Sequence, residues 1–404
     1  MSIRRINLIK IISLQSLMLP LIFNPFSSVP FEIPKVDFFL VSTDIIALIS
    51  LFYIREMNKK NDLRLLVLEI VYLASIILTS LKGVNFYKSF WGNYWRADGI
   101  LTLIHLIGIS FIFSAFWKIN YHKIFIPSVS ISGFIVSLIF IIQKIVSFSN
   151  IPAATFGNSN FLAGYLLVTL PFSLYNFSAS PHKIFWQVNL FLQIMTILLT
   201  QSYSAIILLP IALILWLSHQ KQTSKKNRLL FYAKTILFLL SLFFTAIYLN
   251  HYFQERTKYR GFLPEGRERI YTNAFLAFKE RPLSGWGWAN FDYAFEKISW
   301  PEKWSQDVYV DKAHSLFLEI LSTSGIIGFT IFSTICLITL YNLAKDKKMS
   351  SRTFLLSFIL FLIHSQTNVI SINEEYIFWT IVGIAASKEV KNPRPKGRGF
   401  LGSI

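Results

Sequence analysis

The chain has a single cysteine, Cys336, among 404 residues, and few charged side chains. One cysteine excludes an internal disulfide and a cluster of thiolates around a metal ion. Charged residues make up 15% of the sequence and hydrophobic residues 53%, which is too apolar for an ordinary soluble globular protein. The composition therefore indicates a protein whose solvent is the membrane.

Apolar runs of membrane-crossing length recur along almost the whole sequence. A helix needs roughly 20 residues to cross a hydrocarbon core of about 30 Å. By this criterion the sequence predicts an all-α, polytopic integral membrane protein with about twelve transmembrane helices. The predicted spans are residues 8–25, 37–54, 64–81, 99–117, 124–147, 159–176, 185–200, 202–217, 230–249, 314–341, 353–370 and 375–387.

Acidic residues are scarce relative to basic ones, 21 against 39, which gives a formal charge of +18. Such a surplus can indicate nucleic-acid binding, but here the basic residues fall in alternate connections between spans. These are Arg55, Lys59, Lys60 and Arg64; Lys118 and Lys123; Lys221, Lys225, Lys226 and Arg228; Lys345, Lys347, Lys348 and Arg352. The positive-inside rule then places both termini in the cytoplasm, and membrane lipids explain the charge better than nucleic acid does.

This topology predicts four regions. Residues 1–249 hold nine spans, 250–313 form one large outer loop, 314–387 hold three more spans, and 388–404 form a basic cytoplasmic tail. The loop contains "SGWGWANFDYAF" and "ISWPEKW", which are too aromatic for a disordered segment. Loops of this length in compact proteins are usually functional when they are ordered.

The loop opens with "ERTKYRGFLPEGRERIYTNAFLAFKERP", which carries Arg260, Arg267 and Arg269. Guanidinium groups bind phosphate bidentately, so this cluster can hold a lipid phosphate or pyrophosphate. The alternative is a solvated, salt-bridged loop that only touches headgroups. The apolar spacing after Arg267 predicts an amphipathic helix on the membrane with Arg267 in its first turn. The following "GWGWANF" lacks the glycine spacing of a phosphate-binding loop and predicts a tight turn.

A histidine stands at the head of the next span, in "DKAHSLFLEIL". The sequence predicts His314 in the first turn of a helix that Asp311 caps. The positive end of the helix dipole would keep the imidazole neutral and able to accept a proton. We therefore consider His314 a candidate general base, against the simpler interpretation of an amphipathic boundary residue.

Polar residues continue from this histidine into the span. Ser315, Glu319, Ser322 and Thr323 follow helical spacing and must face protein or water rather than lipid. Glu319 lies about 140° around the helix from His314, so the two form no simple dyad.

Another histidine, His364, lies near the outer end of its span, from which it can approach His314. The histidines have neither paired spacing nor nearby carboxylate ligands, so the sequence predicts no metal site and no cofactor.

Together these segments resemble the O-antigen ligase and O-antigen polymerase family of bacterial membrane glycosyltransferases. The resemblance rests on "GRERIYTNAFLAFKERPLSGWGWANF" and "YVDKAHSLFLEILSTSGIIGF", supported by "NYWRADGILTLI", "TFGNSNFLAGYLLVTLP" and "LPLIFNPFSSVPFEIPK". It implies metal-independent transfer of a glycan from a polyprenyl-pyrophosphate to a lipid or glycan acceptor, at the outer face of the bacterial inner membrane. It also implies that Arg267 grips the pyrophosphate and that His314 activates the acceptor hydroxyl.

Two positions depart from the family pattern. Tyr203 stands where the family has an arginine, and the usual His-Asn pair is His314–Ser315. Arg96, Arg260 and Arg269 are the candidates to supply the missing charge. Three alternatives to a ligase stay open at this point: a polysaccharide polymerase, a small-anion transporter for a bicarbonate-like ion, and a glycan-binding protein without catalysis.

Overall fold

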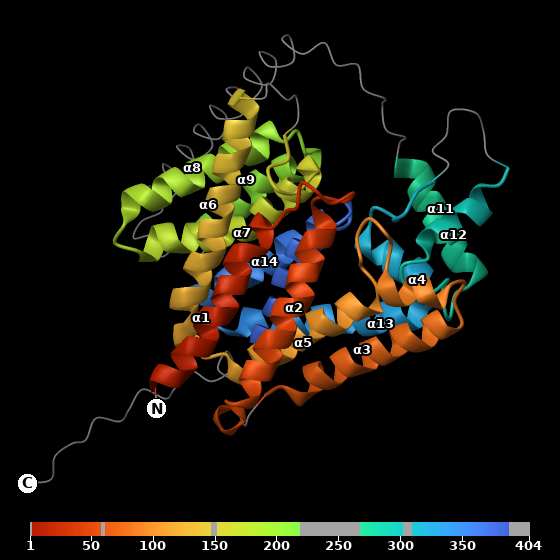
Figure 1. Ribbon diagram of the computed structural model, residues 1–404, viewed down its shortest axis with the longest axis horizontal. Helices are drawn as coiled ribbons and strands as arrows, with labels where there is room; N and C mark the ends of the chain where they lie inside the picture. The colour runs from red at the N-terminus through yellow and green to blue at the C-terminus, as the bar shows by residue number, and fades with distance from the viewer. Residues whose placement is uncertain (1, 58–60, 147–151, 219–266, 302–308, 388–404) are drawn as a thin grey trace, which may run out of the picture.

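The computed structural model describes residues 2–57, 61–146, 152–218, 267–301 and 309–387 (Figure 1). Within these ranges all regular secondary structure is helical, and one isolated bridge pairs Asn61 with Ser387, so the predicted all-α class is confirmed. The α-helices are α1 (Ser2–Met18), α2 (Glu32–Leu51), α3 (Leu63–Leu81), α4 (Phe86–Trp91), α5 (Ile100–Phe116), α6 (His122–Val146), α7 (Ser159–Ala179), α8 (Lys183–Leu199), α9 (Tyr203–Ser218), α11 (Arg267–Glu280), α12 (Phe291–Ser299), α13 (Leu316–Lys345), α14 (Met349–His364) and α15 (Ile372–Ala386). Single turns of 3-10 helix lie at Leu19–Leu21, Ile54–Glu56 and Ile119–Tyr121.

Most predicted spans coincide with a helix. Among the described residues, four helices are long and apolar enough to cross a membrane, namely α3, α6, α7 and α13. Shorter apolar helices lie at Leu8–Leu21, Ile100–Phe116, Lys183–Leu199, Tyr203–Leu217 and Met349–His364. The predicted span 230–249 lies outside the described residues, so the count of twelve stays a prediction.

Contacts between helix ends show which ends lie together. The Lys35 ammonium, near the start of α2, donates to the carbonyl of Thr155 before α7, and the Thr155 hydroxyl donates to the Pro20 carbonyl after α1, each at 2.5 Å. At the opposite end, the backbone N–H of Asp62 donates to the carbonyl of Ala386 at 2.8 Å. We call the first the cavity end, because the cavity described below lies there. The end of α1 and the starts of α2 and α7 therefore lie at the cavity end, and the start of α3 and the end of α15 lie at the opposite end.

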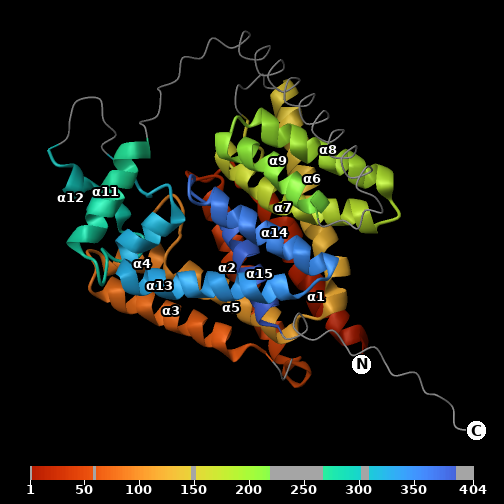
Figure 2. The ribbon, with the colours of Figure 1, turned by 180° about the vertical axis from the view of Figure 1, so that it is seen from behind.

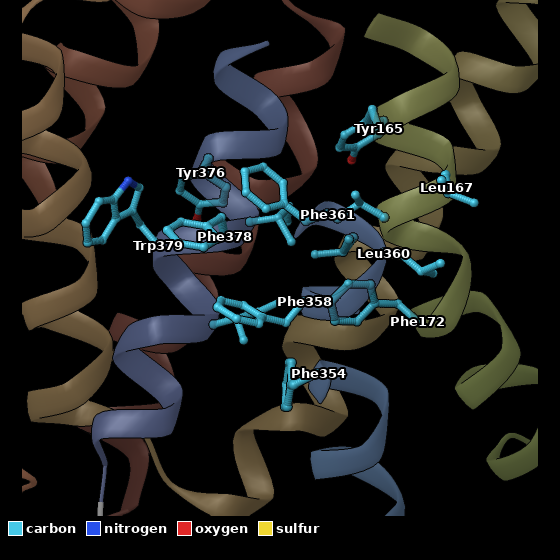
Figure 3. Packing of buried hydrophobic residues seen from close by; sticks show 14 of the residues in the cluster. Tyr165, Leu167, Phe172, Phe354, Phe358, Leu360, Phe361, Tyr376, Phe378 and Trp379 are labelled. Carbon is cyan, nitrogen blue, oxygen red and sulfur yellow. The ribbon is translucent and has the colours of Figure 1, made fainter. Parts of the chain in front are cut away.

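The interior is centred on α15, which is buried on nearly all sides and is apolar after its first turn. Figure 3 shows Phe378 of α15 facing Phe358 and Phe361 of α14. The Phe378 and Phe358 rings stack with centroids 5.1 Å apart, and the Phe361 centroid lies 4.7 Å from that of Phe378. Offset aromatic pairs of this kind add packing energy beyond the area they bury. They fix α14 against α15 and thereby hold the connection between these helices at the cavity end.

The helix α13 is broken near its start. Its 30 residues would extend about 45 Å, which is longer than a membrane core of about 30 Å requires. Gly325 interrupts the helical backbone with φ of +67°. The predicted span 314–341 is therefore divided: residues 326–345 are long enough for a crossing, and residues 316–324 form a separate helical piece beside the cavity.

A turn of the predicted outer loop satisfies the peptide groups that this break leaves free. The N–H groups of Trp286 and Gly287 donate to the carbonyls of Ser322 and Thr323 at 3.0 and 2.8 Å. The N–H of Ile326 donates to the carbonyl of Pro282 at 2.8 Å. Buried peptide groups require such partners, so residues 282–287 complete the hydrogen bonding of α13 at its break. The predicted tight turn in "GWGWANF" is confirmed by positive φ at Gly285, Gly287 and Ala289.

The helices α11 and α12 pack beside α4 and the first part of α13, away from α8 and α9 (Figure 2). The predicted helix after Arg267 is confirmed over Arg267–Glu280. A small apolar cluster joins the two helices to the segment before α13; it consists of Ile270, Ala274, Phe291, Phe295, Val310 and Ala313. This packing sets the position of α11, and with it Arg267, relative to His314.

Replacing Gly325 with alanine tests the break in α13. A Cβ there would lie 2.3 Å from the Leu283 carbonyl oxygen, on a backbone conformation that strains an alanine. We expect Gly325→Ala to destabilise the protein by about 1–3 kcal/mol and to lower Tm, measured by tryptophan fluorescence in detergent. Gly108→Ala in α5 is the matched control, since its Cβ would meet nothing within 4 Å. Equal Tm values for both variants would contradict the strained break.

Candidate functional site

A cavity of about 60 Å³ lies at the cavity end, between the starts of α2, α5, α13 and α15 and the connection that follows α14. Its walls are unusually rich in ionisable groups for a protein of this composition. The lining includes Glu32, Arg96, Asp98, Trp288, Lys312, His314, Ser315, Glu319, Asn368 and Glu375. Three of the sequence-predicted site residues, Arg96, His314 and Glu319, therefore meet at one place.

His314 precedes α13 rather than occupying its first turn. Its backbone has φ of +53°, and Ser315 is the N-cap, whose hydroxyl accepts from the N–H of Leu318 at 3.4 Å. The predicted cap by Asp311 is wrong, because this carboxylate binds a distant arginine instead. The hydroxyl of Tyr271, one turn after Arg267 on α11, donates to the His314 carbonyl at 3.4 Å. These contacts hold the histidine at the cavity wall.

The connection after α14 fixes the start of α13. The N–H of Leu316 donates to the Ser365 carbonyl at 2.8 Å. The side-chain oxygen of Gln366 accepts from the Ser315 hydroxyl at 3.1 Å and from the N–H of Phe317 at 3.3 Å. Free N–H groups at a helix start need such acceptors. The predicted span 353–370 is thus too long, since α14 ends at His364 and the next residues serve as caps for α13.

The environment of His314 favours the neutral imidazole. Burial lowers the pKa of His314, and the positive charges of Arg267 and Arg96 lower it further, whereas Asp311 opposes them. The direction agrees with the predicted neutral base. The prediction invoked the helix dipole, whereas burial and two arginines lower the pKa here.

Arg96 forms an ion pair with Asp311. Its Nε lies 2.7 Å from Asp311 Oδ2, and its guanidinium stacks over the Phe161 ring at 5.4 Å. Both charged side chains are about four-fifths buried, so solvent screens their attraction only partly. The pair ties the connection before α5 to the segment before α13.

Lys312 forms a second bridge between the same two segments. Its ammonium contacts Asp98 and lies 3.3 Å from Glu319 Oε1, while Glu319 Oε2 accepts from the N–H of Ala313 at 2.7 Å. Burial would raise the pKa of Asp98, but Lys312 and the N–H of Asn93 hold it below its ordinary value. The carboxylate of Glu319 thus binds the Lys312 ammonium and the N–H of Ala313, in agreement with the prediction that it forms no dyad with His314.

Arg267 reaches the cavity wall through the connection after α14. Its guanidinium donates to the Thr367 carbonyl and, at 3.2 Å, to Asn368 Oδ1. The Asn368 amide donates to the Ser204 hydroxyl at 2.5 Å and contacts His364 Nε2 at 3.2 Å. Asn368 lines the cavity, so the arginine is anchored immediately beside it.

His364 stands behind Asn368. It is fully buried, and its Nδ1 lies 3.3 Å from Glu374 Oε1. Asn368 lines the cavity together with His314, and the approach of His364 to His314 stays a prediction. The sequence carries a sign of the site at Asn368, because the polar run "SQTNVISINEE" begins inside the predicted span 353–370.

The remaining predicted residues divide into three cases. The Arg269 guanidinium of α11 packs over the ring of Phe295 of α12, with 4.9 Å between the guanidinium carbon and the ring centroid. Arg260 lies outside the described residues. Tyr203 is 85% exposed at the start of α9, beside Ser204, which bonds to the asparagine that holds Arg267. Position 203 is therefore close to Arg267, although this chain places a tyrosine there.

Among the described residues, no three His, Cys, Asp or Glu side chains are grouped to hold a metal ion.

The fold and the cavity define a helical membrane protein with a charged site at one end of its helices. Residues 188–333 match the family model described as O-antigen ligase. The match includes Arg267, His314 and the break in α13, so the resemblance inferred from the motifs is confirmed over this part of the chain. This part of the chain is thus similar to the O-antigen ligase family. No curated protein matches it.

A double-mutant cycle on Arg96 and Asp311 tests whether this pair holds the site together. We expect the single alanine variants to lose stability and the double variant to lose less than their sum, with a coupling of about 0.5–3 kcal/mol from denaturation in detergent. The matched control is Lys297–Glu280, which has a similar separation of 2.8 Å but is 60% and 38% exposed. Its coupling should be smaller, because exposed pairs contribute little. Equal coupling in both pairs would contradict the role of burial.

Proposed function

We propose that this protein transfers a glycan from a polyprenyl-pyrophosphate donor to an acceptor hydroxyl at the outer face of the bacterial cytoplasmic membrane. The observation that carries the proposal is the placement of His314, with its lowered pKa, at a cavity whose wall anchors Arg267 through Asn368. The match of residues 188–333 to the O-antigen ligase family supports the same chemistry.

In the proposed reaction the neutral His314 imidazole takes the proton of the acceptor hydroxyl. The acceptor oxygen then bonds to the anomeric carbon of the glycan, and the bond from that carbon to the pyrophosphate oxygen breaks. The electron pair leaves with the polyprenyl pyrophosphate, whose negative charge increases by one. A positioned base and a fixed positive charge at the leaving group both lower such a barrier.

Arg267 is suited to the leaving group because its position is fixed before substrate binds. A guanidinium has five N–H donors, and the contacts to Thr367 and Asn368 engage two of them. Arg96 also lines the cavity, but Asp311 offsets its charge, so we assign it to positioning the segment before α13. We assign Arg269 to packing against Phe295, while Arg260 stays a predicted pyrophosphate contact.

The position of the charges favours an enzyme over an anion transporter. Transporters place their ion sites near the bilayer midplane. Here the ionisable groups gather where α2, α13 and α15 begin, whereas Arg55 and Lys348 follow the opposite ends of α2 and α13. By the positive-inside rule the cavity then faces outward. A polymerase would use the same groups with a second glycan as acceptor, and product length separates it from a ligase.

Substitution of His314 and Arg267 tests the transfer reaction. His314→Asn keeps a side chain that tolerates positive φ, and we expect it to lower kcat by about 10²–10⁴-fold because the base is lost. Arg267→Lys keeps the charge but loses the fork geometry, so we expect a smaller loss. The assay measures glycan transfer from a polyprenyl-pyrophosphate glycan in vesicles, with and without chelator.

The matched controls are His182→Asn, at an exposed position between α7 and α8, and Lys279→Ala, at an exposed position on α11. Both should transfer at the wild-type rate. Full activity of His314→Asn would refute the proposed base, and loss of activity with chelator would refute metal-independent transfer.

The pH dependence provides a separate test of His314. The protonated imidazole cannot accept a proton, so the rate should fall as pH drops through the pKa of His314. Because burial and two arginines lower this pKa, the half-maximal rate should lie below about pH 6.5. Asp311→Asn removes a negative charge and should move the midpoint to lower pH, whereas Arg267→Gln should move it to higher pH. Shifts in the opposite directions would contradict the assignment.

A further inference from the structure

A line of polar side chains runs from Arg267 into the protein interior behind the cavity. Arg267 donates to Asn368 Oδ1 at 3.2 Å, and the Asn368 amide nitrogen lies 3.2 Å from His364 Nε2. On the other side of the imidazole, His364 Nδ1 lies 3.3 Å from Glu374 Oε1. The side chains of His364 and Glu374 are fully buried, and the reaction proposed above uses neither of them.

The direction of these hydrogen bonds follows from Arg267. A guanidinium only donates, so the Asn368 amide must turn its oxygen toward Arg267 and its NH₂ group toward His364. The same NH₂ group donates to the Ser204 hydroxyl at 2.5 Å. His364 Nε2 must then be an acceptor, which requires a neutral ring whose single proton lies on Nδ1, because both nitrogens of an imidazolium donate.

Glu374 accepts this proton on the far side of the ring. No other hydrogen-bond partner within the described residues reaches His364 Nδ1 or Glu374 Oε1, so each atom is left to the other. Glu374 Oε2 accepts from the N–H of Ser371 at 3.1 Å and from its hydroxyl at 3.4 Å, within the capping box that begins α15. Both oxygens of Glu374 therefore act as acceptors.

The helix α7 packs directly against this pair. A Cβ at Gly164 would lie 2.3 Å from Glu374 Oε1 and 2.4 Å from His364 Cε1. The backbone of α7 thus leaves no room for another donor or acceptor on that side. The imidazole and the carboxyl group are held against each other by the fold.

We propose that His364 and Glu374 are positioning residues that orient the Asn368 amide and thereby hold Arg267 at the cavity wall. Glu374 keeps the imidazole proton on Nδ1, so Nε2 accepts from the NH₂ group of Asn368, whose oxygen is left for Arg267. A proton on Nε2 would turn the amide over and place its NH₂ group against the guanidinium, where two donors face each other. The inference rests on the proposed function, because it assigns these residues to the grip of Arg267 on the pyrophosphate.

The position of the His364 proton is measured directly by ¹⁵N NMR. The full chain, with its seven histidines labelled with ¹⁵N, is placed in phosphatidylcholine nanodiscs, and His364→Gln identifies the His364 signals by their loss. We expect the proton on Nδ1 in the wild type at neutral pH. Signals that place the proton on Nε2, or on both nitrogens, would overturn the inference whether or not the protein transfers a glycan.

Reversal of the hydrogen bonds is the second test. Glu374→Gln keeps the shape of the side chain, but Ser371 binds the amide oxygen and leaves the amide NH₂ group facing His364. The imidazole proton should then move to Nε2. Binding of farnesyl pyrophosphate, measured by calorimetry in the same nanodiscs, should weaken about tenfold because Arg267 is no longer fixed in advance. Adding Asn368→Asp should restore most of the binding, since a carboxylate accepts from both Nε2–H and the guanidinium.

Glu296→Gln, which makes the same change at an exposed position on α12, is the matched control and should bind farnesyl pyrophosphate as the wild type does. In an Arg267→Ala background, Glu374→Gln should cause no further loss, because it acts through the arginine. Wild-type binding by Glu374→Gln, or no recovery when Asn368→Asp is added, would overturn the inference. Failure of the proposed function is distinguishable: a chain with the expected proton position and binding pattern that forms no glycan product keeps the positioning residues and loses the transfer reaction.

Discussion

The ammonium of Lys312, placed between Asp98 and Glu319, is the contact on which the candidate site depends. It joins the connection before α5, the segment before α13 and the first turn of α13. Desolvating three charged groups is expensive, and only close geometry with further hydrogen bonds repays it. Here Asn93 and Ala313 supply N–H donors to the two carboxylates. Loss of any member leaves a buried charge behind, so the network specifies one arrangement.

His314 lies two residues beyond this lysine and owes its position to it. The residue has positive φ, which a histidine adopts at a cost unless its surroundings fix it. Lys312 anchors the backbone on one side, and the Ser315 cap anchors it on the other. The same segment carries Asp311, whose bond to Arg96 sets how much positive charge the imidazole experiences. The network therefore determines both where the candidate base stands and in which protonation state it rests.

Much of the fold was predictable because apolar runs of a given length report helices directly. The helix over Arg267–Glu280 followed from local spacing, and the burial of Ser322 and Thr323 followed from helical periodicity. The cap by Asp311 was predicted wrongly because a local rule competed with an ion pair to a residue 215 positions away. The break at Gly325 was equally hidden, since the turn that completes it comes from about 40 residues earlier in the chain. Long-range partners decided these features, and one sequence does not reveal them.

The break in α13 also explains why the loop and the membrane helices form one site. In lipid, free peptide groups must find partners within the protein, so the turn at residues 282–287 is held where α13 changes direction. That turn continues into Trp288, whose indole reaches Asp98 beside Lys312. On the other side the loop continues back into α11, which carries Arg267 to Asn368. A membrane requirement for satisfied hydrogen bonds thus brings the turn that leads to Trp288 and the helix that carries Arg267 to the same cavity.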